Sequence, residues 1–250
     1  MDIPEKLLET LRTAGHVTFL TGAGLSAESG LPTFRGKEAG LWENFNPMEI
    51  ATPYAFVRDP AFVWGWYEWR RMKAMQARPN AGHLATTALQ RKLNHLSVLT
   101  QNVDDLHERA GTRFVRHLHG TLQSPRCISC GQAHEFPKGI PQEPEGGRRI
   151  EPPRCTRCGS RVRPGVVWFG ESIPKAEWEA AERSARQCDV FFCIGTSGLV
   201  EPAASLVHFA RERGAPTVQV NTESTGLEDR ISYDLRGSAA HVLPALVGRL

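Results

Sequence analysis

The chain has 250 residues, of which 40% are hydrophobic and 23% charged, a balance typical of a folded globular protein with one large domain or two unequal ones. The formal net charge is only +3, which gives no case for a nucleic-acid-binding platform. No apolar run reaches membrane-spanning length, and the first residues contain neither a basic leader nor an apolar core. We therefore expect a cytoplasmic protein with no membrane or nucleic-acid partner.

A short apolar run at 16–20 leads directly into a glycine-rich turn and then a helical stretch. Gly22 and Gly24, with Ala27 in the third position, fit the spacing of a dinucleotide-binding fingerprint. Glycines let the backbone approach a phosphate, and free N–H groups at the start of the helix favour its negative charge. Taken alone, this stretch is equally well explained as a turn that binds no ligand.

The acidic residue that usually closes a second strand about 20 residues after that fingerprint does not occur in the expected setting. Residues 31–36 form a polar and aromatic loop, and Glu43 and Glu49 stand in no strand-like context. A dinucleotide would therefore be held differently here from the way a common dehydrogenase holds it.

Strand-like and helix-like segments alternate along the chain, which predicts an α/β protein with a Rossmann-like, doubly wound parallel sheet. Ligands of such sheets bind at the carboxyl ends of the strands, where this sequence repeatedly places small or polar residues. The strand-like segments are 16–20, 96–100, 113–118, 165–170, 189–194 and 217–220, and the clearest helical ones are 83–92, 175–187 and 202–213.

Four of the six cysteines form two Cys-x-x-Cys pairs, Cys127 with Cys130 and Cys155 with Cys158. In a chain without a secretory leader this pattern predicts one structural Zn²⁺ rather than disulfides, and four thiolates leave no open position for catalysis. The 24 residues between the pairs exceed the usual spacing, so the Pro-, Gly- and Arg-rich segment 137–154 is predicted to be an inserted, mobile loop.

A series of short motifs, taken together, resembles the sirtuins, which are NAD-dependent protein-lysine deacylases. The motifs are Gly22-Ala23-Gly24-x-Ser26, Thr33-Phe34-Arg35, Gln101-Asn102-Val103-Asp104, His119-Gly120, the two cysteine pairs, Gly195-Thr196-Ser197 and Asn221. The resemblance runs from about residue 15 to 245 and is specific, because motifs on different strands occur in order in one sequence. Within the family the chain is similar to the bacterial class III branch of desuccinylases and deacetylases.

The resemblance implies two domains. A Rossmann-like NAD-binding domain would be discontinuous, made of 1–36, 82–125 and 162–250. A smaller domain would combine a helical module at 37–81 with a zinc-binding module at 126–161. NAD and the acyl-lysine of a protein or peptide substrate would meet in the cleft between the two.

The resemblance also implies roles for single residues. The acyl oxygen displaces nicotinamide, and His119 would then act as the general base that lets the acyl group migrate to the ribose, a task suited to its ordinary pKa. His117 would point to the opposite face of its strand and be structural. The implied NAD contacts are Gly22, Ala23, Gly24, Ser26, Glu28, Phe34, Arg35, Gln101, Asn102, Val103, Asp104, Gly195, Thr196, Ser197, Asn221, Thr222, Glu223 and Ala239.

Tyr67 and Arg70 are spaced i and i+3 on a predicted helix and resemble the pair with which the desuccinylase branch binds the distal carboxylate. Ala51 matches the small residue that widens the acyl pocket in that branch. The plain alternative is an exposed arginine beside an aromatic residue on a surface helix. The segment to which a substrate peptide would add as a strand is Val167, Trp168 and Phe169.

We therefore predict an enzyme that removes succinyl, malonyl-type and acetyl groups from lysine, giving nicotinamide, O-acyl-ADP-ribose and free lysine. An NAD-dependent oxidoreductase would need the ribose-binding acid that the 31–36 loop displaces. A zinc-ribbon binding module without catalysis is disfavoured by the polar clusters that end several strands. Mono-ADP-ribosyl transfer at the same site uses the same residues and stays open.

Overall fold

A computed structural model of the chain describes residues 3–33 and 45–250. Its main feature is a six-stranded sheet in the order β3-β2-β1-β6-β7-β8, with every pairing parallel. The predicted doubly wound parallel sheet is confirmed, and the winding reverses between β1 and β6. The strands are β1 (Val17–Thr21), β2 (Leu96–Thr100), β3 (Val115–His117), β6 (Val190–Ile194), β7 (Thr217–Asn221) and β8 (Tyr233–Arg236).

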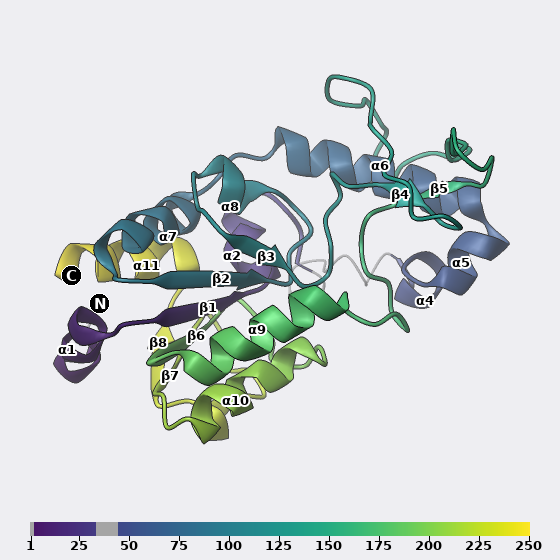
Figure 1. Cartoon of the computed structure of the whole chain (residues 1–250). Helices are drawn as coiled ribbons and strands as arrows, with labels where there is room; N and C mark the ends of the chain where they lie inside the picture. The colour runs from purple at the N-terminus through teal and green to yellow at the C-terminus, as the bar shows by residue number, and fades with distance from the viewer. Residues whose placement is uncertain (1–2, 34–44) are drawn as a thin grey trace.

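The central strands β1 and β6 are buried along their whole length, as continuous apolar runs in a parallel sheet require. Two hydrophobic clusters cover the two faces of the sheet. On one face lie α1 (Glu5–Thr13), α7 (Ala81–Lys92) and α11 (Ala239–Arg249), and on the other α9 (Lys175–Gln187) and α10 (Leu206–Glu212) (Figure 1).

Short helices surround the ends of the strands. The predicted helix at 202–213 begins as a 3-10 turn and becomes α-helical only at Leu206. No helix in the described ranges is long and apolar enough to cross a membrane. The short elements are α2 (Ala23–Ser26), η1 (Ala27–Ser29), α8 (Leu106–Arg109), η2 (Ala203–Ser205) and η3 (Glu228–Arg230).

A second part of the molecule lies beyond the carboxyl ends of the strands (Figure 1). It contains α4 (Pro47–Ile50), α5 (Pro53–Arg58), α6 (Pro60–Gln76) and a two-stranded antiparallel sheet of β4 (Arg126–Cys127) and β5 (Val162–Arg163). Each helix begins at a proline that follows a capping side chain (Asn46, Thr52 or Asp59), which accepts a hydrogen bond from the first turn. A third hydrophobic cluster, which includes Trp66 and Trp168, joins these elements.

The segment 137–154 contains no helix or strand, but it is held against α6 by contacts that its composition did not suggest. The Ile150 N–H donates to the Ala61 carbonyl at 3.0 Å, and Arg149 forms a two-point ion pair with Asp59 at 2.6 and 2.7 Å. A Cβ on Gly65 would lie 1.6 Å from the Arg148 carbonyl oxygen, so only glycine lets this segment lie directly on the helix.

The segment 165–170, predicted as a strand, is not one. Val166 forms an isolated antiparallel bridge with Gly120, and the Val167 N–H donates to the His119 carbonyl at 2.8 Å. The pairing stops there, because the Phe169 N–H donates to the Ala51 carbonyl at 2.9 Å and the chain turns at Phe169 and Gly170. The Thr121 N–H also donates to the Gly165 carbonyl at 3.3 Å. The chain entering the cysteine-rich segment therefore lies against the chain leaving it.

Candidate active site

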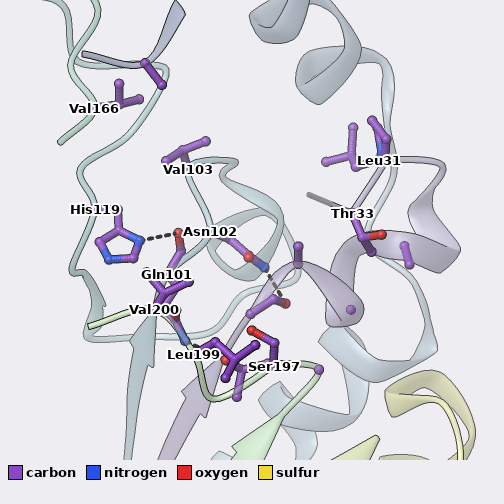
Figure 2. A pocket seen from close by; sticks show the side chains of 18 of the residues that line it. Leu31, Thr33, Gln101, Asn102, Val103, His119, Val166, Ser197, Leu199 and Val200 are labelled. Atoms are coloured by element: carbon purple, nitrogen blue, oxygen red, sulfur yellow. Dashed lines mark hydrogen bonds between the residues drawn. The ribbon is translucent and has the colours of Figure 1, made fainter. Parts of the chain in front are cut away.

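A cleft of about 1490 Å³ lies at the carboxyl edge of the sheet, between the strand ends and the α6 side of the molecule. All the predicted catalytic, cofactor and substrate residues within the described ranges line it, except Ser26 and Asp104. Those two line a smaller adjoining cavity of about 30 Å³. Phe34 and Arg35 fall outside the described residues. Figure 2 shows His119 beside Gln101 and Asn102, with Leu31 and Thr33 on the other side of the pocket.

The glycines after β1 are needed for a close contact between two turns of the chain. A Cβ on Gly22 would lie 2.7 Å from the Gly195 carbonyl oxygen, and one on Gly24 would lie 2.8 Å from the Gly195 Cα. The Gly24 N–H donates to the Gly195 carbonyl at 2.9 Å, so it is not free to meet a phosphate. Gly195 itself has a φ of +59°. These glycines let the turns after β1 and β6 cross in contact, which forms a floor without side chains at the switch point of the sheet.

Asn102 is a buried amide held in one orientation. Its Nδ2 donates to the Gly22 carbonyl at 3.0 Å and to Ser26 Oγ at 3.2 Å, which turns Oδ1 away from those two groups. Ser26 in turn donates to Asp104 at 3.1 Å, and the Leu106 N–H donates to the other Asp104 oxygen at 3.1 Å. Burial raises the pKa of Asp104 despite these two bonds. This network places an oriented amide and a carboxyl group side by side, at two of the NAD contacts that the resemblance implied.

His119 and His117 differ in what their ring nitrogens contact. His119 Nδ1 lies 3.2 Å from the Gln101 carbonyl oxygen, which only accepts, so the neutral ring carries its proton on Nδ1 and a lone pair on Nε2 (Figure 2). Burial lowers the pKa of His119, and the bond to Gln101 opposes this only in part. In His117 both nitrogens are bonded, Nδ1 to the Asn102 carbonyl at 3.0 Å and Nε2 to Glu108 at 2.7 Å.

Three polar side chains connect the ends of neighbouring strands across the cleft floor. Gln101, after β2, donates through Nε2 to Thr196 Oγ1 at 2.9 Å. Asn221, at the end of β7, donates to the Thr196 carbonyl at 3.0 Å. Residues from β2, β6 and β7 are thus fixed relative to one another along one side of the cleft, in the order in which the sheet arranges those strands.

Tyr67 and Arg70 lie on α6, line the cleft and are close enough to interact electrostatically. The Arg70 guanidinium lies 5.2 Å from the centre of the Trp66 ring. Burial lowers the pKa of Arg70, with Tyr67 and Asp104 opposing the shift. Arginine keeps its charge in proteins, so the cleft wall contains a partly desolvated cation. Ala51, with its small side chain, lines the same cleft.

Several cleft residues were missed by reasoning from sequence. Gly237, Ser238 and the segment 199–202 line the cleft, as does an ion pair between Lys73 of α6 and Glu145, whose charged atoms lie 2.9 Å apart. Gly237 and Ser238 follow β8, a four-residue strand with one buried side chain, which gives only a weak periodic signal. Lys73 repeats the Arg70 position one helical turn later, and this spacing was the available sequence signal.

The four paired cysteines come together outside the cleft. Their Sγ atoms all lie within 4.8 Å of one another, with 3.4 Å between Cys127 and Cys158 and 3.7 Å between Cys130 and Cys155. A tetrahedral zinc with Zn–S bonds of about 2.3 Å requires sulfur separations of about 3.8 Å, so this donor set fits one structural Zn²⁺. Gly131 and Gly159, which follow the two pairs, have φ values of +71° and +75°, as tight knuckle turns require.

Comparison with known proteins agrees with this geometry. A family model described as "Sir2 family" matches residues 22–202. The chain belongs to the Sir2 family. A relative called NAD-dependent protein deacylase, from Methylococcus capsulatus, is 52% identical over 250 residues, covering 100% of this chain and 98% of the relative.

Solved structures of Sir2 proteins share the fold. A Sir2 homologue in complex with NAD superimposes with a TM-score of 0.89 at 46% identity, covering 99% of this chain and 93% of the other. A more distant Sir2 protein, bound to a deacetylated peptide and 3′-O-acetyl-ADP-ribose, has a TM-score of 0.83 at 26% identity, covering 98% of this chain and 97% of the other.

Proposed function

We propose that this Sir2 protein is an NAD-dependent protein-lysine deacylase, which moves an acyl group from lysine to ADP-ribose and releases nicotinamide. The observation that carries the proposal is the position of His119, which lines the same cleft as the oriented Asn102 amide and the glycine floor at Gly22 and Gly195. The names of the Sir2 relatives and the ligands in their solved structures support the same reaction.

NAD is consumed in this reaction and is a substrate. The glycine floor between β1 and β6 would receive its phosphates closely, and Asn102, fixed by Gly22 and Ser26, would bind the carboxamide of nicotinamide and orient the leaving group. After nicotinamide leaves, Nε2 of His119 would accept a proton from a ribose hydroxyl so that the acyl group can migrate. Burial keeps His119 neutral at pH 7, which is the form a base requires.

We further propose that acidic acyl groups of the succinyl and malonyl type are preferred substrates, with acetyl groups also accepted. A carboxylate entering the cleft loses water and needs a partner. Arg70 offers a fixed positive charge with parallel donors, Tyr67 a hydroxyl, and Ala51 the space for a longer chain.

The two-domain division and a cytoplasmic location belong to the same proposal. The third hydrophobic cluster, separate from the two that cover the sheet, supports a small unit made of the α4–α6 segment and the zinc segment. The pairing of β5 with β4 supports including Arg163, two residues past the expected boundary, in this proposed unit. Zinc-binding thiolates are typical of reducing compartments, which supports the location.

The test is a mass-spectrometric assay with NAD and one peptide sequence bearing acetyl-, malonyl-, succinyl- or glutaryl-lysine. We expect free lysine peptide, nicotinamide and O-acyl-ADP-ribose in equal amounts, with succinyl or malonyl peptides turned over fastest. NADH absorbance without nicotinamide release would indicate an oxidoreductase instead. A gain of ADP-ribose mass on the peptide, with the acyl group retained, would indicate ADP-ribosyl transfer. The His119→Ala protein provides the inactive control.

A further inference from the structure

Tyr67 has a hydrogen-bond partner that fixes which way its hydroxyl can donate. The indole Nε1 of Trp168 lies 3.1 Å from the Tyr67 oxygen, and both side chains are buried. An indole N–H can only donate, so the Tyr67 oxygen is the acceptor. The hydroxyl hydrogen of Tyr67 must then point away from Trp168. Burial raises the pKa of Tyr67 to about 12, so the hydroxyl stays protonated and remains a donor.

Trp168 is itself held by a partly buried ion pair. The Arg163 guanidinium carbon lies 3.6 Å from the centre of a Trp168 ring, and Arg163 is only 6% exposed. Arg163 forms a two-point pair with Glu171, and one Glu171 oxygen also accepts the main-chain N–H of Trp168 at 2.8 Å. The indole is therefore stacked on its face and anchored at its backbone by the same pair of side chains.

Arg163 connects this arrangement to the zinc segment. It lies on β5 and pairs in register with Arg126 of β4, the residue before the zinc ligand Cys127. Its other donors are used by main-chain oxygens, at 3.0 Å from Val166 and 3.3 Å from Pro164. Apart from the bond to Tyr67, the polar contacts described here that hold Trp168 thus come from the chain that leaves the zinc segment.

We propose that Trp168 is a positioning residue for acyl selectivity, which orients the Tyr67 hydroxyl toward the carboxylate of an acidic acyl group, and that the Arg163–Glu171 pair holds the indole for this task. The inference rests on the proposed function. Acetyl-lysine has no distal carboxylate and makes no use of the oriented hydroxyl. The hydrogen bond from Trp168 should therefore raise kcat/KM for succinyl-lysine substrates and leave kcat/KM for acetyl-lysine substrates unchanged.

The experiment is a double-mutant cycle of Trp168→Phe and Tyr67→Phe, with kcat/KM measured on matched succinyl- and acetyl-lysine peptides. Phenylalanine keeps an aromatic ring for Arg163 but has no N–H. One neutral hydrogen bond predicts that Trp168→Phe lowers the succinyl-to-acetyl ratio about 2- to 10-fold. In the Tyr67→Phe background the same change should leave the ratio unaltered, because the hydroxyl it acts through is gone.

Arg163→Lys gives a second, independent arm, since lysine keeps the charge but not the flat two-point contact with Glu171. It should also lower the ratio, by less than Trp168→Phe, and only while Tyr67 is present. Trp64→Phe is the matched control: it removes the same atoms from the same hydrophobic cluster, and its ring packs on Phe136 outside the cleft. The control should lower thermal stability without moving the ratio.

Equal losses on both peptides, or additive effects of Trp168→Phe and Tyr67→Phe on the ratio, would show that Trp168 only supports the fold and would overturn the inference. The proposed function fails separately, when the unmodified protein shows no NAD-dependent deacylation. If Trp168→Phe does not fold, the Arg163→Lys arm with and without Tyr67 decides the matter alone.

Discussion

His119 Nδ1 lies 3.2 Å from the main-chain oxygen of Gln101, the residue that begins the polar cluster after β2. This contact sets the tautomer of the ring, because the carbonyl requires a proton on Nδ1. Nε2 is thereby the basic nitrogen whenever the ring is neutral. A main-chain atom cannot be removed by substitution, so the orientation of the base is built into the path of the backbone.

His119→Ala should lower deacylation on the order of 10²- to 10⁴-fold, the range typical of a lost general base. NAD binding, measured by calorimetry, should persist because the cleft floor is unchanged. His117→Ala is the natural comparison: it removes bonds to Glu108 and Asn102 and should cost stability more than rate. The assignment would be reversed if His117→Ala were the inactive protein.

The pH profile of kcat/KM, which reports the free enzyme, should show its acidic limb below pH 6.5. The neutral form of His119 is the active one, and burial lowers its pKa from 6.5, so activity is lost only as the pH falls through that lowered value. Rates measured between pH 5 and 8, on a substrate without a titrating carboxylate such as acetyl-lysine, provide the check. A limb centred above pH 6.5 would speak against His119 as the titrating base.

Replacement of Cys127 or Cys155 by serine should release the metal and unfold the small unit, because the free energy of metal binding is part of its free energy of folding. Zinc content by elemental analysis and a melting curve measure both effects. Cys193→Ser is the control, since Cys193 is buried in β6 away from the four-cysteine cluster. A metal-free Cys127→Ser protein with an unchanged melting curve would refute the structural role.

Arg70→Met should reduce succinyl turnover at least tenfold more than acetyl turnover, since leaving a buried carboxylate unpaired costs roughly 2–5 kcal/mol. The loss should lie mainly in KM if the contact is equally strong in the ground and transition states. Arg71→Met is the matched control on the same helix, because Arg71 pairs with Glu68 and stacks on Phe136 outside the cleft. Equal losses on both substrates would reduce Arg70 to a structural role.

His83→Gln should make the protein less sensitive to acid. His83 is fully buried, and burial lowers its pKa from 6.5 to about 4. Between pH 6.5 and pH 4 the unfolded chain binds a proton at His83 that the folded chain does not. The contribution of His83 to the free energy of unfolding is therefore fully present above pH 6.5 and falls by about 3 kcal/mol in total toward pH 4. Glutamine can keep the capping bond to Asn80 without titrating.

The measurement is the melting temperature of both proteins from pH 7 to pH 4.5. The difference between the two melting temperatures should shrink or change sign as the pH falls. Because the comparison uses only this difference, effects common to both proteins, such as loss of zinc, cancel. Burial also lowers the pKa of His107, which packs against His83, so His107 likewise makes the folded protein less stable in acid. The pKa of His117 is raised by Glu108 despite burial, so His117 makes the folded protein more stable in acid. Parallel curves would show that His83 does not contribute to acid sensitivity.

The strands and the ordered motifs were predictable because their signals are local. Short apolar runs such as 96–100 and 190–194 are typical of buried strands, and two Cys-x-x-Cys pairs are typical of one zinc site. What could not be predicted depends on contacts between distant segments. The space at Gly24 is set by Gly195, about 170 residues later, and no local pattern in the sequence indicates that contact.

Two other outcomes have the same origin. The segment 165–170 has the composition of a strand, yet its N–H groups are shared among His119, Ala51 and Glu171, so no neighbouring strand is available to it. The role of Trp168 depends on Tyr67, about 100 residues earlier in the chain, and on Arg163. A single sequence without an alignment contains no signal for such pairs.

The contact between the chain at Gly120 and Thr121 and the chain at Gly165 and Val166 has a consequence for how such a protein can change over evolutionary time. The cysteine-rich segment begins and ends at nearly the same place beside the sheet, so its two ends are neighbours in space. An insertion whose two ends adjoin can gain or lose residues at a small cost in loop-closure entropy. Such a change does not displace the strands whose ends line the cleft. Outside the four cysteines and the contacts of Arg149 and Ile150 with α6, this segment can therefore change in length, whereas Arg163 is constrained by its contact with Trp168.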